Sequence, residues 1–360
     1  VVLRHPKTPS AADIDSLFTA TSSAEDNNNS VPSLTSPYVK MCADMYAASS
    51  NKKRRRVIVG SGNVSVGKGE PVALLTLSES ASERTFCLVF SLSHVVGDGR
   101  TYYEILQMLQ PGAAVRALTS VRRMHFSEMM RDNCGRNALE WADSTDAACL
   151  FTCSMLPAMT GFSKKAKCVA FHLDADRLAA AKSEAVTRGE AAYVSTNDVL
   201  TSGFFNACGS RIGMMGMDCR GRLEGIEQDL AGNYVTALVM DEGTFRTPAA
   251  VRKMLSSMPY ETTMQPLPGC CGWFRGKESA KFAMVTNWSS FAGGLVQFEG
   301  SEMVIHLPVQ NPAACVFDLM IPFASGPGKV GVICWTVNSD EDGLRKVLPV
   351  GECVSRDLFP

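Results

Sequence analysis

The chain has 360 residues, of which 46% are apolar and 20% are charged. This length exceeds what one compact core needs and fits two domains of ordinary size. The formal net charge is −1, so no overall electrostatic field attracts nucleic acid or an acidic membrane surface. The sequence has no uncharged apolar run of about 18 residues, so we predict no membrane-spanning helix.

The cysteines number 13, are irregularly spaced, and in several cases lie inside apolar runs, as do Cys87, Cys168, Cys208 and Cys334. We interpret them as buried free thiols in a reducing compartment, which predicts an intracellular, cytoplasmic protein. The chain begins with Val1 and lacks the apolar stretch of a signal peptide at its start. A processed N-terminus would instead fit a plastid protein. No CxxC pair occurs at zinc-finger spacing, so we predict no bound metal.

Apolar periodicity and turn residues predict a mixed α/β (α+β) chain. Predicted strands cover residues 57–59, 71–77, 85–92, 167–173, 213–217, 234–240, 282–286, 302–307, 315–322 and 329–336. Predicted helices cover residues 39–49, 101–109, 175–186 and 199–208, and a short helix begins at Asp340. Residues 20–37 are polar and predict a loop. A second loop at 157–167 marks a domain boundary, so we predict domains at 1–162 and 163–360.

His94 stands where a buried strand runs into a glycine-containing turn, in the segment FSLSHVVGDG, and a helix is predicted to follow. A histidine there is held on a rigid element, and an imidazole takes up and releases a proton near neutral pH. Asp98 lies four residues later and is suited to hold the loop by pairing with a cation elsewhere. Gly97 and Gly99 allow a tight backbone path. The pattern predicts a general base at His94, with a purely structural histidine as the alternative.

The same spacing of histidine and aspartate occurs a second time, between His172 and Asp176. His172 ends a predicted strand, Asp174 is a good N-cap for the next helix, and Asp176 falls in the first turn of that helix. No glycine lies in this segment. We therefore predict a structural role for His172 and give the catalytic role to His94.

Several segments, in order, resemble the plant-type BAHD acyltransferases, within the fold shared by chloramphenicol acetyltransferase and peptide-synthetase condensation domains. PVALLTLSESASERTFCLVFSLSHVVGDGRTYYEIL is similar to the family's strand pair, its HxxxDG motif and the following helix. KCVAFHLDADRLAAAKSEA and YVSTNDVLTSGFFNAC resemble the opening of its second domain. MGMDCRGRLEGIEQDLAGNYV is similar to the Asp-x-Arg-x-Arg strand with its later Gly-Asn, and KFAMVTNWSSF resembles the Thr-x-Trp segment. Together the matches cover about residues 70–340.

The resemblance implies two similar sheet-and-helix domains with a tunnel between them. Coenzyme A would enter this tunnel from one face and a small-molecule acceptor from the other. His94 would remove a proton from a hydroxyl or amine of the acceptor, which then attacks the thioester of acyl-CoA without forming an acyl-enzyme. Acyl-CoA is thus expected as a co-substrate, with no permanently bound cofactor.

The resemblance also implies roles for other residues. Asp98 would pair with an arginine of the DCRGR segment; in an extended strand Arg220 and Arg222 share a face, and we choose Arg220. Gly97 and Thr286 would line the acyl-transfer tunnel. The indole N–H of Trp288 would help to hold the oxyanion, unless Trp288 is only part of the core.

A further implied site lies at the start of the predicted helix 199–208. Ser195 and Thr196 precede this helix, where free backbone N–H groups and the helix dipole favour a phosphate. We expect them to bind the coenzyme A pyrophosphate, with simple helix capping as the alternative.

Two departures from the family pattern keep a second reading open. The family's Asp-Phe-Gly-Trp-Gly segment is replaced here by AGGLVQFEG at residues 292–300, and only about 90 residues precede His94. Both favour a catalytically inactive member that acts as a binding or assembly subunit, whereas the presence of His94, Asp98 and Arg220 argues against it. A condensation-type domain is disfavoured because Ser93 stands where a second histidine is usual.

Overall fold

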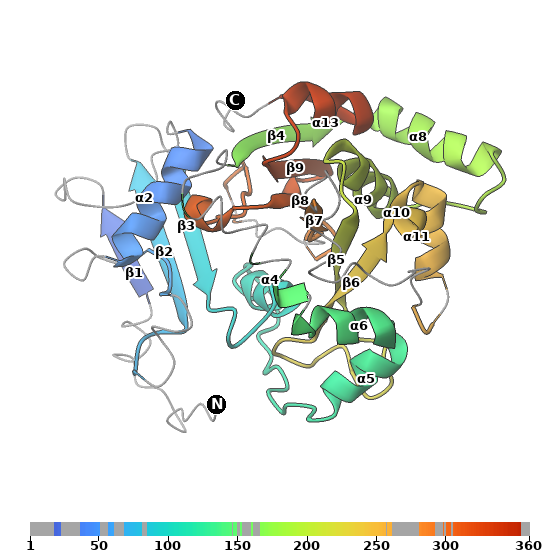
Figure 1. The fold of residues 1–360 in the computed structure, drawn as a ribbon. Helices are drawn as coiled ribbons and strands as arrows, with labels where there is room; N and C mark the ends of the chain where they lie inside the picture. The colour runs from blue at the N-terminus through green and yellow to red at the C-terminus, as the bar shows by residue number, and fades with distance from the viewer. Residues whose placement is uncertain are drawn as a thin grey trace.

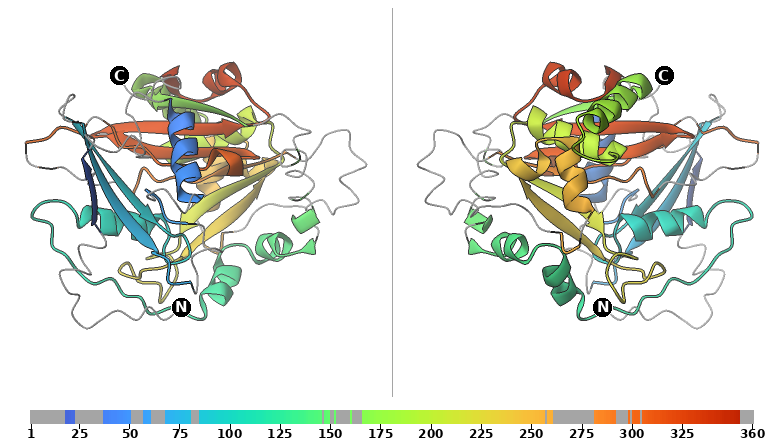
Figure 2. Two further views of the ribbon diagram at one scale, coloured as in Figure 1. Left: turned by 90° about the vertical axis from the view of Figure 1, so that its left-hand side faces the viewer. Right: turned by 90° about the vertical axis from the view of Figure 1, so that its right-hand side faces the viewer.

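Within the described residues the strands form two β-sheets, one of three strands and one of seven. In this computed structural model the described residues are 18–22, 37–50, 57–60, 68–80, 85–145, 147–149, 152, 160, 166–256, 258–260, 281–291, 298, 300–303 and 305–353. Figures 1 and 2 show the smaller sheet to one side of the larger one. The predicted mixed α/β class is confirmed.

The smaller sheet contains β1 (Phe18–Ser22), β2 (Ala73–Ser80) and β3 (Thr85–Leu92), in the order β1-β2-β3. β2 and β3 are antiparallel neighbours, with Ala73 opposite Leu92 and Ser80 opposite Thr85. β1 runs parallel to β2. The predicted hairpin is therefore present, and its second strand ends two residues before His94.

The larger sheet has the strand order β10-β4-β9-β8-β7-β5-β6. Its strands are β4 (Lys167–Leu173), β5 (Ile212–Asp218), β6 (Val235–Asp241), β7 (Phe282–Val285), β8 (Asp318–Gly326), β9 (Lys329–Thr336) and β10 (Val350–Cys353). Only β7 runs parallel to its neighbours, β5 and β8. The sheet thus mixes both kinds of pairing, and the parallel neighbours β5 and β7 lead into the segments that carry Arg220 and Thr286.

The helices of the first half of the chain are α2 (Tyr38–Ser50), α4 (Gly99–Gln107), α5 (Phe126–Asn133) and α6 (Arg136–Ala142). Those of the second half are α8 (Ala175–Thr187), α9 (Thr196–Ala207), α10 (Glu242–Phe245), α11 (Pro248–Leu255) and α13 (Glu341–Val347), with a 3₁₀ turn at Pro312–Ala314. Polar N-caps begin several of them: the side chains of Asp98, Asp174, Ser195 and Asp340 each accept a backbone N–H in the first turn.

The larger sheet is buried on both faces, as the alternating side chains of β9 illustrate. Val332 and Cys334 face a cluster that includes residues of α9, whereas the alternate residues Ile333 and Trp335 face a cluster that includes residues of α2. A strand that is covered on both faces appears in the sequence as a continuous apolar run. This explains why β8 and β9 are easy to recognise from their composition.

Two predicted strands are wrong. Residues 57–59 form no strand, although Val57 and Ile58 are buried. Among residues 302–307, the described ones also lie outside any strand. Both are apolar runs that pack against the core without a partner strand, and periodicity alone does not distinguish such a run from a strand.

The predicted boundary between the domains falls mostly outside the described residues, since 153–159 and 161–165 are not among them. The three strands of the smaller sheet precede it and the seven strands of the larger sheet follow it. The division into 1–162 and 163–360 stays a prediction.

Eight cysteines among the described residues carry free thiols, and six of these are buried. Burial raises the pKa of the Cys315 thiol to about 12, which keeps it protonated and unreactive. Cys149, by contrast, is disulfide-bonded, so the prediction of free thiols is wrong at that position.

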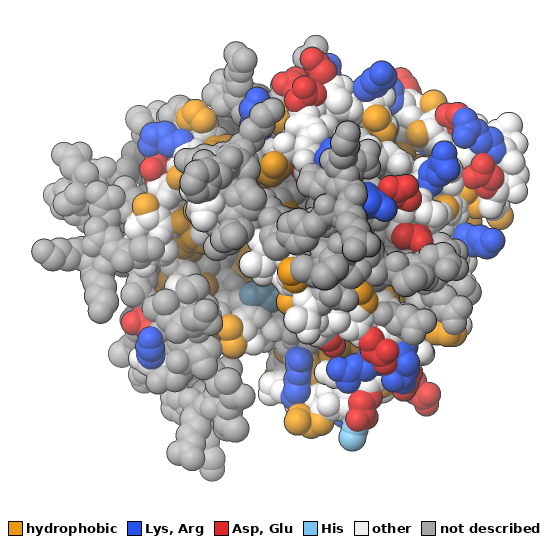
Figure 3. Space-filling view, viewed as in Figure 1, with side chains coloured by type: hydrophobic (Ala, Val, Ile, Leu, Met, Phe, Trp, Pro, Cys, Tyr) orange, Lys and Arg blue, Asp and Glu red, His pale blue; other side chains and the backbone are white. Residues whose placement is uncertain are grey.

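Charged side chains of both signs are interspersed over the right-hand half of the face in Figure 3. This distribution agrees with the small net charge of the sequence. Among the described residues, none of the helices has the length and apolar character required to cross a membrane.

Gly213 of β5 allows α9 to pack closely on the sheet, because a Cβ at this position would overlap the ring of Phe205. We predict that Gly213→Ala lowers the free energy of unfolding by about 1–3 kcal/mol through overpacking. Gly326→Ala in the same sheet is the control, since its Cβ would meet no atom within 4 Å, and we expect a change within about 0.5 kcal/mol. Urea unfolding measures both; equal midpoints would contradict the close packing.

Candidate active site

His94 lies in the turn that follows β3, with an exposed side chain. Three backbone contacts fix the turn. The amide N–H of Ser93 donates to the carbonyl of Val72 at 2.8 Å, and that of Val96 donates to Ser93 at 3.0 Å. The side chain of Asn233 donates to the carbonyl oxygen of His94 at 2.7 Å. The second half of the chain therefore helps to position the histidine.

Asp98 is the N-cap of α4 and is only 2% exposed. One carboxylate oxygen accepts the backbone N–H of Thr101 at 3.0 Å, and the other accepts that of Tyr234 at 2.9 Å. Arg220 donates to both oxygens, at 3.2 Å and 3.0 Å. The carboxylate is thus fully engaged by protein donors and supports the loop rather than meeting a substrate.

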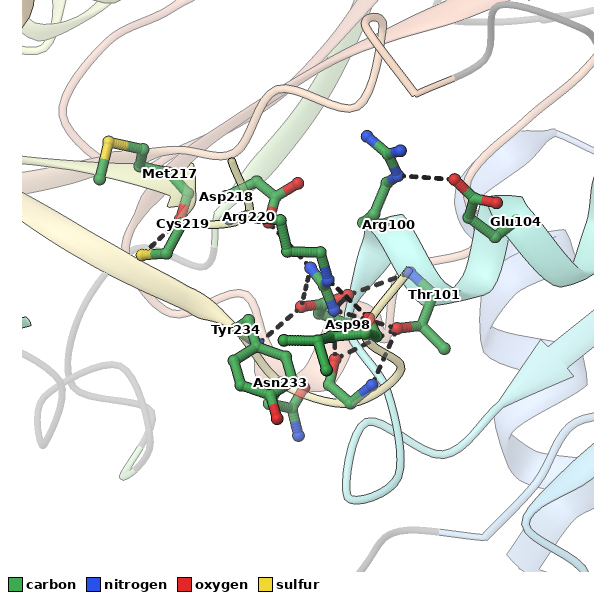
Figure 4. Close-up of polar contacts among 12 residues, drawn as sticks. Asp98, Arg100, Thr101, Glu104, Met217, Asp218, Cys219, Arg220, Asn233 and Tyr234 are labelled. Carbon is green, nitrogen blue, oxygen red and sulfur yellow. Dashed lines mark hydrogen bonds and ion pairs between the residues drawn. The ribbon is translucent and has the colours of Figure 1, made fainter. Parts of the chain in front are cut away.

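Arg220 uses its whole guanidinium group in this contact, as Figure 4 shows. Besides Asp98, it donates to the carboxylate of Asp218, the hydroxyl of Thr101, and the carbonyls of Leu230 and Gly232 at 2.7 and 2.9 Å. Its guanidinium carbon lies 5.1 Å from the centroid of the Tyr234 ring. Because a buried guanidinium is stable only when its donors are satisfied, this network ties the His94 loop firmly to the segment after β5.

The expected pairing of Asp98 with Arg220 is present, but the expected extended strand through Arg220 and Arg222 is wrong. β5 ends at Asp218, and residues 220–222 form a turn rather than an extended strand. In this turn Arg220 points inward and is 3% exposed. Arg222 is exposed and donates to the hydroxyl of Tyr260 at 3.3 Å.

Gly97 is buried between the His94 turn and α4. A Cβ there would come within 2.9 Å of the Thr101 side chain and 3.1 Å of Leu92, which is tighter than side chains allow. Gly99 has more room, with the Phe291 ring at 3.7 Å and the indole nitrogen of Trp288 at 3.9 Å from a Cβ. The glycine of the motif that is required for close packing is therefore Gly97.

Thr286 and Trp288 follow β7 and lie beside this loop. Their backbone N–H groups donate to Met320 and Pro322 of β8, at 3.0 and 2.8 Å. The indole N–H of Trp288 donates to the hydroxyl oxygen of Thr286 at 3.0 Å. This changes the expected role of Trp288: its N–H is occupied by Thr286, and the Thr286 hydroxyl keeps its own hydrogen for another acceptor.

A cavity of about 1650 Å³ connects these residues. It lies between β3 and α2 on one side and β5, β6, β7 and β8 on the other. Its lining includes the predicted residues His94, Gly97, Asp98, Thr286 and Trp288. Much of the remaining wall is apolar or aromatic, with contributions from Phe90, Tyr102, Phe291, Ile305, Leu307 and Phe317.

Ser195 and Thr196 lie at the start of α9 and are not part of the cavity wall. Ser195 forms a capping box with Asp198, whose buried carboxylate also pairs with Arg252 at 2.6 Å. The alternative role, a simple helix cap, is thus present. A link to the cavity exists through Asn197, whose side chain accepts a hydrogen bond from Asn287 at 2.9 Å. Binding of a pyrophosphate here stays a prediction.

His172 lies on β4. Its Nδ1 is 3.4 Å from the hydroxyl of Ser325, and burial lowers its pKa. Asp174 caps α8 by accepting the N–H of Arg177 at 2.9 Å. His172 is not part of the cavity wall.

Sequence reasoning missed several residues of the site. The backbone N–H of Tyr234 donates to the Asp98 carboxylate, and the side chain of Asn233 donates to the backbone carbonyl of His94. The Gly-Asn of the resemblance pointed to residues 232–233 but not to what they contact. Of the segment 292–300, only Phe298 and Gly300 are described, so most of the AGGLVQFEG stretch lies outside the described residues.

The chain is similar in fold to solved structures with little sequence identity. Vinorine synthase matches at 12% identity and a TM-score of 0.47, over 81% of this chain and 67% of that chain. TRI101 of F. graminearum, complexed with ethyl coenzyme A, matches at 12% identity and a TM-score of 0.48, over 91% of this chain and 79% of that chain. VibH, an NRPS condensation enzyme, matches at 9% and 0.41 over 77% and 68%.

No protein-family model matches the chain, and no curated protein matches it.

The buried ion pair gives a test of the site's architecture. We predict that Arg220→Gln lowers the free energy of unfolding by about 3–5 kcal/mol, because it leaves the Asp98 carboxylate buried without its cation. Arg222→Gln is the matched control, since Arg222 is exposed, and we expect a change below about 1 kcal/mol. Chemical unfolding followed by circular dichroism measures both. Equal stability of the two variants would show that the pair does not support the fold.

Proposed function

We propose that the protein is an acyltransferase that moves an acyl group from acyl-CoA to a hydroxyl or amine of a small-molecule acceptor. The observation that carries this proposal is the position of His94. His94 is among the residues that line a large, mostly apolar cavity, together with Thr286 and Trp288. Its backbone is fixed from both halves of the chain.

In the proposed reaction, His94 acts as the general base. Its imidazole takes the proton of the acceptor's O–H or N–H as the oxygen or nitrogen bonds to the thioester carbonyl carbon. When the C–S bond breaks, the imidazolium returns this proton to the sulfur, and free coenzyme A leaves. Proton transfer of this kind depends on a fixed distance between base and acceptor, which the contacts of Ser93, Asn233 and Asp98 maintain.

The negative charge that develops on the carbonyl oxygen needs a hydrogen-bond donor. The Thr286 hydroxyl suits this role, because its oxygen accepts the N–H of Trp288 and its hydrogen is left to point at the substrate. A donor that is polarised in this way is stronger than an isolated hydroxyl. We therefore place Thr286 against the oxyanion and Trp288 behind it as a positioning residue.

The base predicts a clear mutational result. His94→Ala should lower the rate of acyl transfer about 10²–10⁴-fold, because the proton acceptor is lost. The fold should be unchanged, since the His94 side chain is exposed. Transfer is measured by release of coenzyme A from acetyl-CoA and longer acyl-CoA esters with a panel of alcohols and amines.

The control for this experiment is His172→Gln, which changes the other histidine with the same spacing. We expect near wild-type transfer from this variant. If His94→Ala retained transfer within a few-fold of wild type, His94 would not be the base. If His172→Gln lost transfer while remaining folded, the choice between the two histidines would be wrong.

The proposal also requires that the protein bind coenzyme A. At a hundredfold excess over Kd, binding should stabilise the native state by about 2.7 kcal/mol, which raises the melting temperature by a few degrees. Acetyl-CoA should do the same. Ser195→Ala should lower the starting melting temperature by loss of the helix cap, and should reduce the ligand-induced shift only if α9 holds the pyrophosphate. No shift with several acyl-CoA esters at millimolar concentration would favour a non-catalytic binding subunit.

A further inference from the structure

A second histidine, His306, lies in the wall of the same cavity. It belongs to the segment before β8 that was predicted as a strand. Its backbone N–H donates to the carbonyl of Ser325 at 2.9 Å, and its ring Nδ1 lies 2.7 Å from the carbonyl oxygen of Ala324. Two contacts to the end of β8 therefore fix both the backbone and the ring.

These contacts determine which ring nitrogen carries the proton. A carbonyl oxygen only accepts hydrogen bonds, so Nδ1 must be the protonated nitrogen. Burial lowers the pKa of His306, which keeps the imidazole neutral at neutral pH. Nε2 then has a lone pair and no hydrogen, and it faces the hydroxyl of Tyr103 at 3.4 Å.

Tyr103 supplies the hydrogen of its contact with Nε2, because the hydrogen on Nδ1 is donated to Ala324. The residue is 2% exposed, and burial raises its pKa well above the ordinary value. Its ring is held by packing against Tyr102, Phe291 and His306, with ring centroids 5.1, 6.3 and 5.7 Å away. The contact of 3.4 Å is a long hydrogen bond. While the hydroxyl hydrogen is directed to Nε2, the pair offers lone pairs to a ligand and no N–H or O–H.

The pair lies close to the proposed reaction centre. Tyr103 follows Gly99 by four residues on α4, which corresponds to one helical turn or about 6 Å along the helix axis. Phe291 lies beside both Gly99 and Tyr103, and the Trp288 indole is next to Gly99. A substrate held with its reacting group at Thr286 and His94 would therefore extend along an apolar wall toward Tyr103 and His306.

We propose that Tyr103 and His306 form a subsite that accepts a hydrogen bond from a second hydroxyl or N–H group of the substrate, one helical turn along α4 from Gly99. This inference rests on the proposed function, since it takes the cavity for the substrate site. It assigns the substrate to a class: a largely apolar molecule that carries a hydrogen-bond donor away from the group that reacts. A carbonyl at that position finds no partner.

The test compares ligands that have the same shape and differ only at the distal group. The acceptor set is 1,4-benzenedimethanol, 4-ethylbenzyl alcohol and 4-acetylbenzyl alcohol, which place a donor, an apolar group and an acceptor at that position. The acyl set is 4-(hydroxymethyl)benzoyl-CoA and 4-ethylbenzoyl-CoA. Dissociation constants are measured by calorimetry or by thermal shift, so the result does not depend on turnover.

With the wild-type protein we expect the distal hydroxyl to improve binding about three- to tenfold over the ethyl compound, as one net hydrogen bond does. The ketone should show no gain. If the dissociation constants differ within the alcohol set, the subsite binds the acceptor. If they differ within the acyl set, the subsite binds the acyl group. Equal binding within both sets, or a ketone that binds as tightly as the diol, overturns the proposal.

Two variants separate this role from simple packing. In His306→Phe the Tyr103 hydrogen is released, so the ketone should gain affinity and the diol should lose its advantage over it. In the double variant Tyr103→Phe with His306→Phe, all three alcohols should bind alike. Discrimination that survives in the double variant contradicts the subsite. A protein that discriminates in binding but transfers no acyl group would leave the subsite standing and remove the proposed reaction.

Discussion

The ion pair between Asp98 and Arg220 joins the two halves of the chain at the point where the site is formed. Asp98 caps α4 from the first half, and Arg220 follows β5 in the second half. Both charges are almost fully buried, and each is satisfied by several further hydrogen bonds. Removing either partner would leave the other charge without compensation in a medium that solvates it poorly. The position of His94, four residues before Asp98, therefore depends on a contact made 122 residues away in sequence.

The cavity combines two kinds of surface. Around His94, Thr286 and Trp288, the backbone is held by contacts to Val72, β8 and the loop after β5. Beyond them, much of the wall is aromatic and aliphatic, and it includes Tyr103 and His306. A site of this kind places chemistry at one end and shape recognition along its length. Apolar contacts give affinity in such a cavity, and a few fixed polar groups give orientation.

Much of the fold could be predicted from local patterns, because buried strands and capped helices leave clear signals. The hairpin before His94, the pair β8 and β9, and the caps at Asp174 and Ser195 are of this kind. The predicted strand at 302–307 is wrong because an apolar segment can be buried without pairing with a neighbouring strand. The choice of Arg220 over Arg222 depended on the turn after Asp218, which no periodicity reveals. The protonation of His306 at Nδ1 can be inferred only from its contact with the carbonyl oxygen of Ala324. Ala324 lies 18 positions later, and the sequence does not reveal this contact.

The close fit between the His94 loop and the segment from Asp218 to Tyr234 also constrains how the sequence changes over evolutionary time. A lineage that lost Arg220 first would carry an uncompensated carboxylate, and one that lost Asp98 first would carry an uncompensated guanidinium. Either intermediate would be selected against for its poor folding, whatever its activity. Asp98 and Arg220 are therefore expected to be inherited or replaced together. Substitutions of Gly97 and Thr101 should also be restricted. The pair would then stay recognisable among related proteins after their surfaces have diverged.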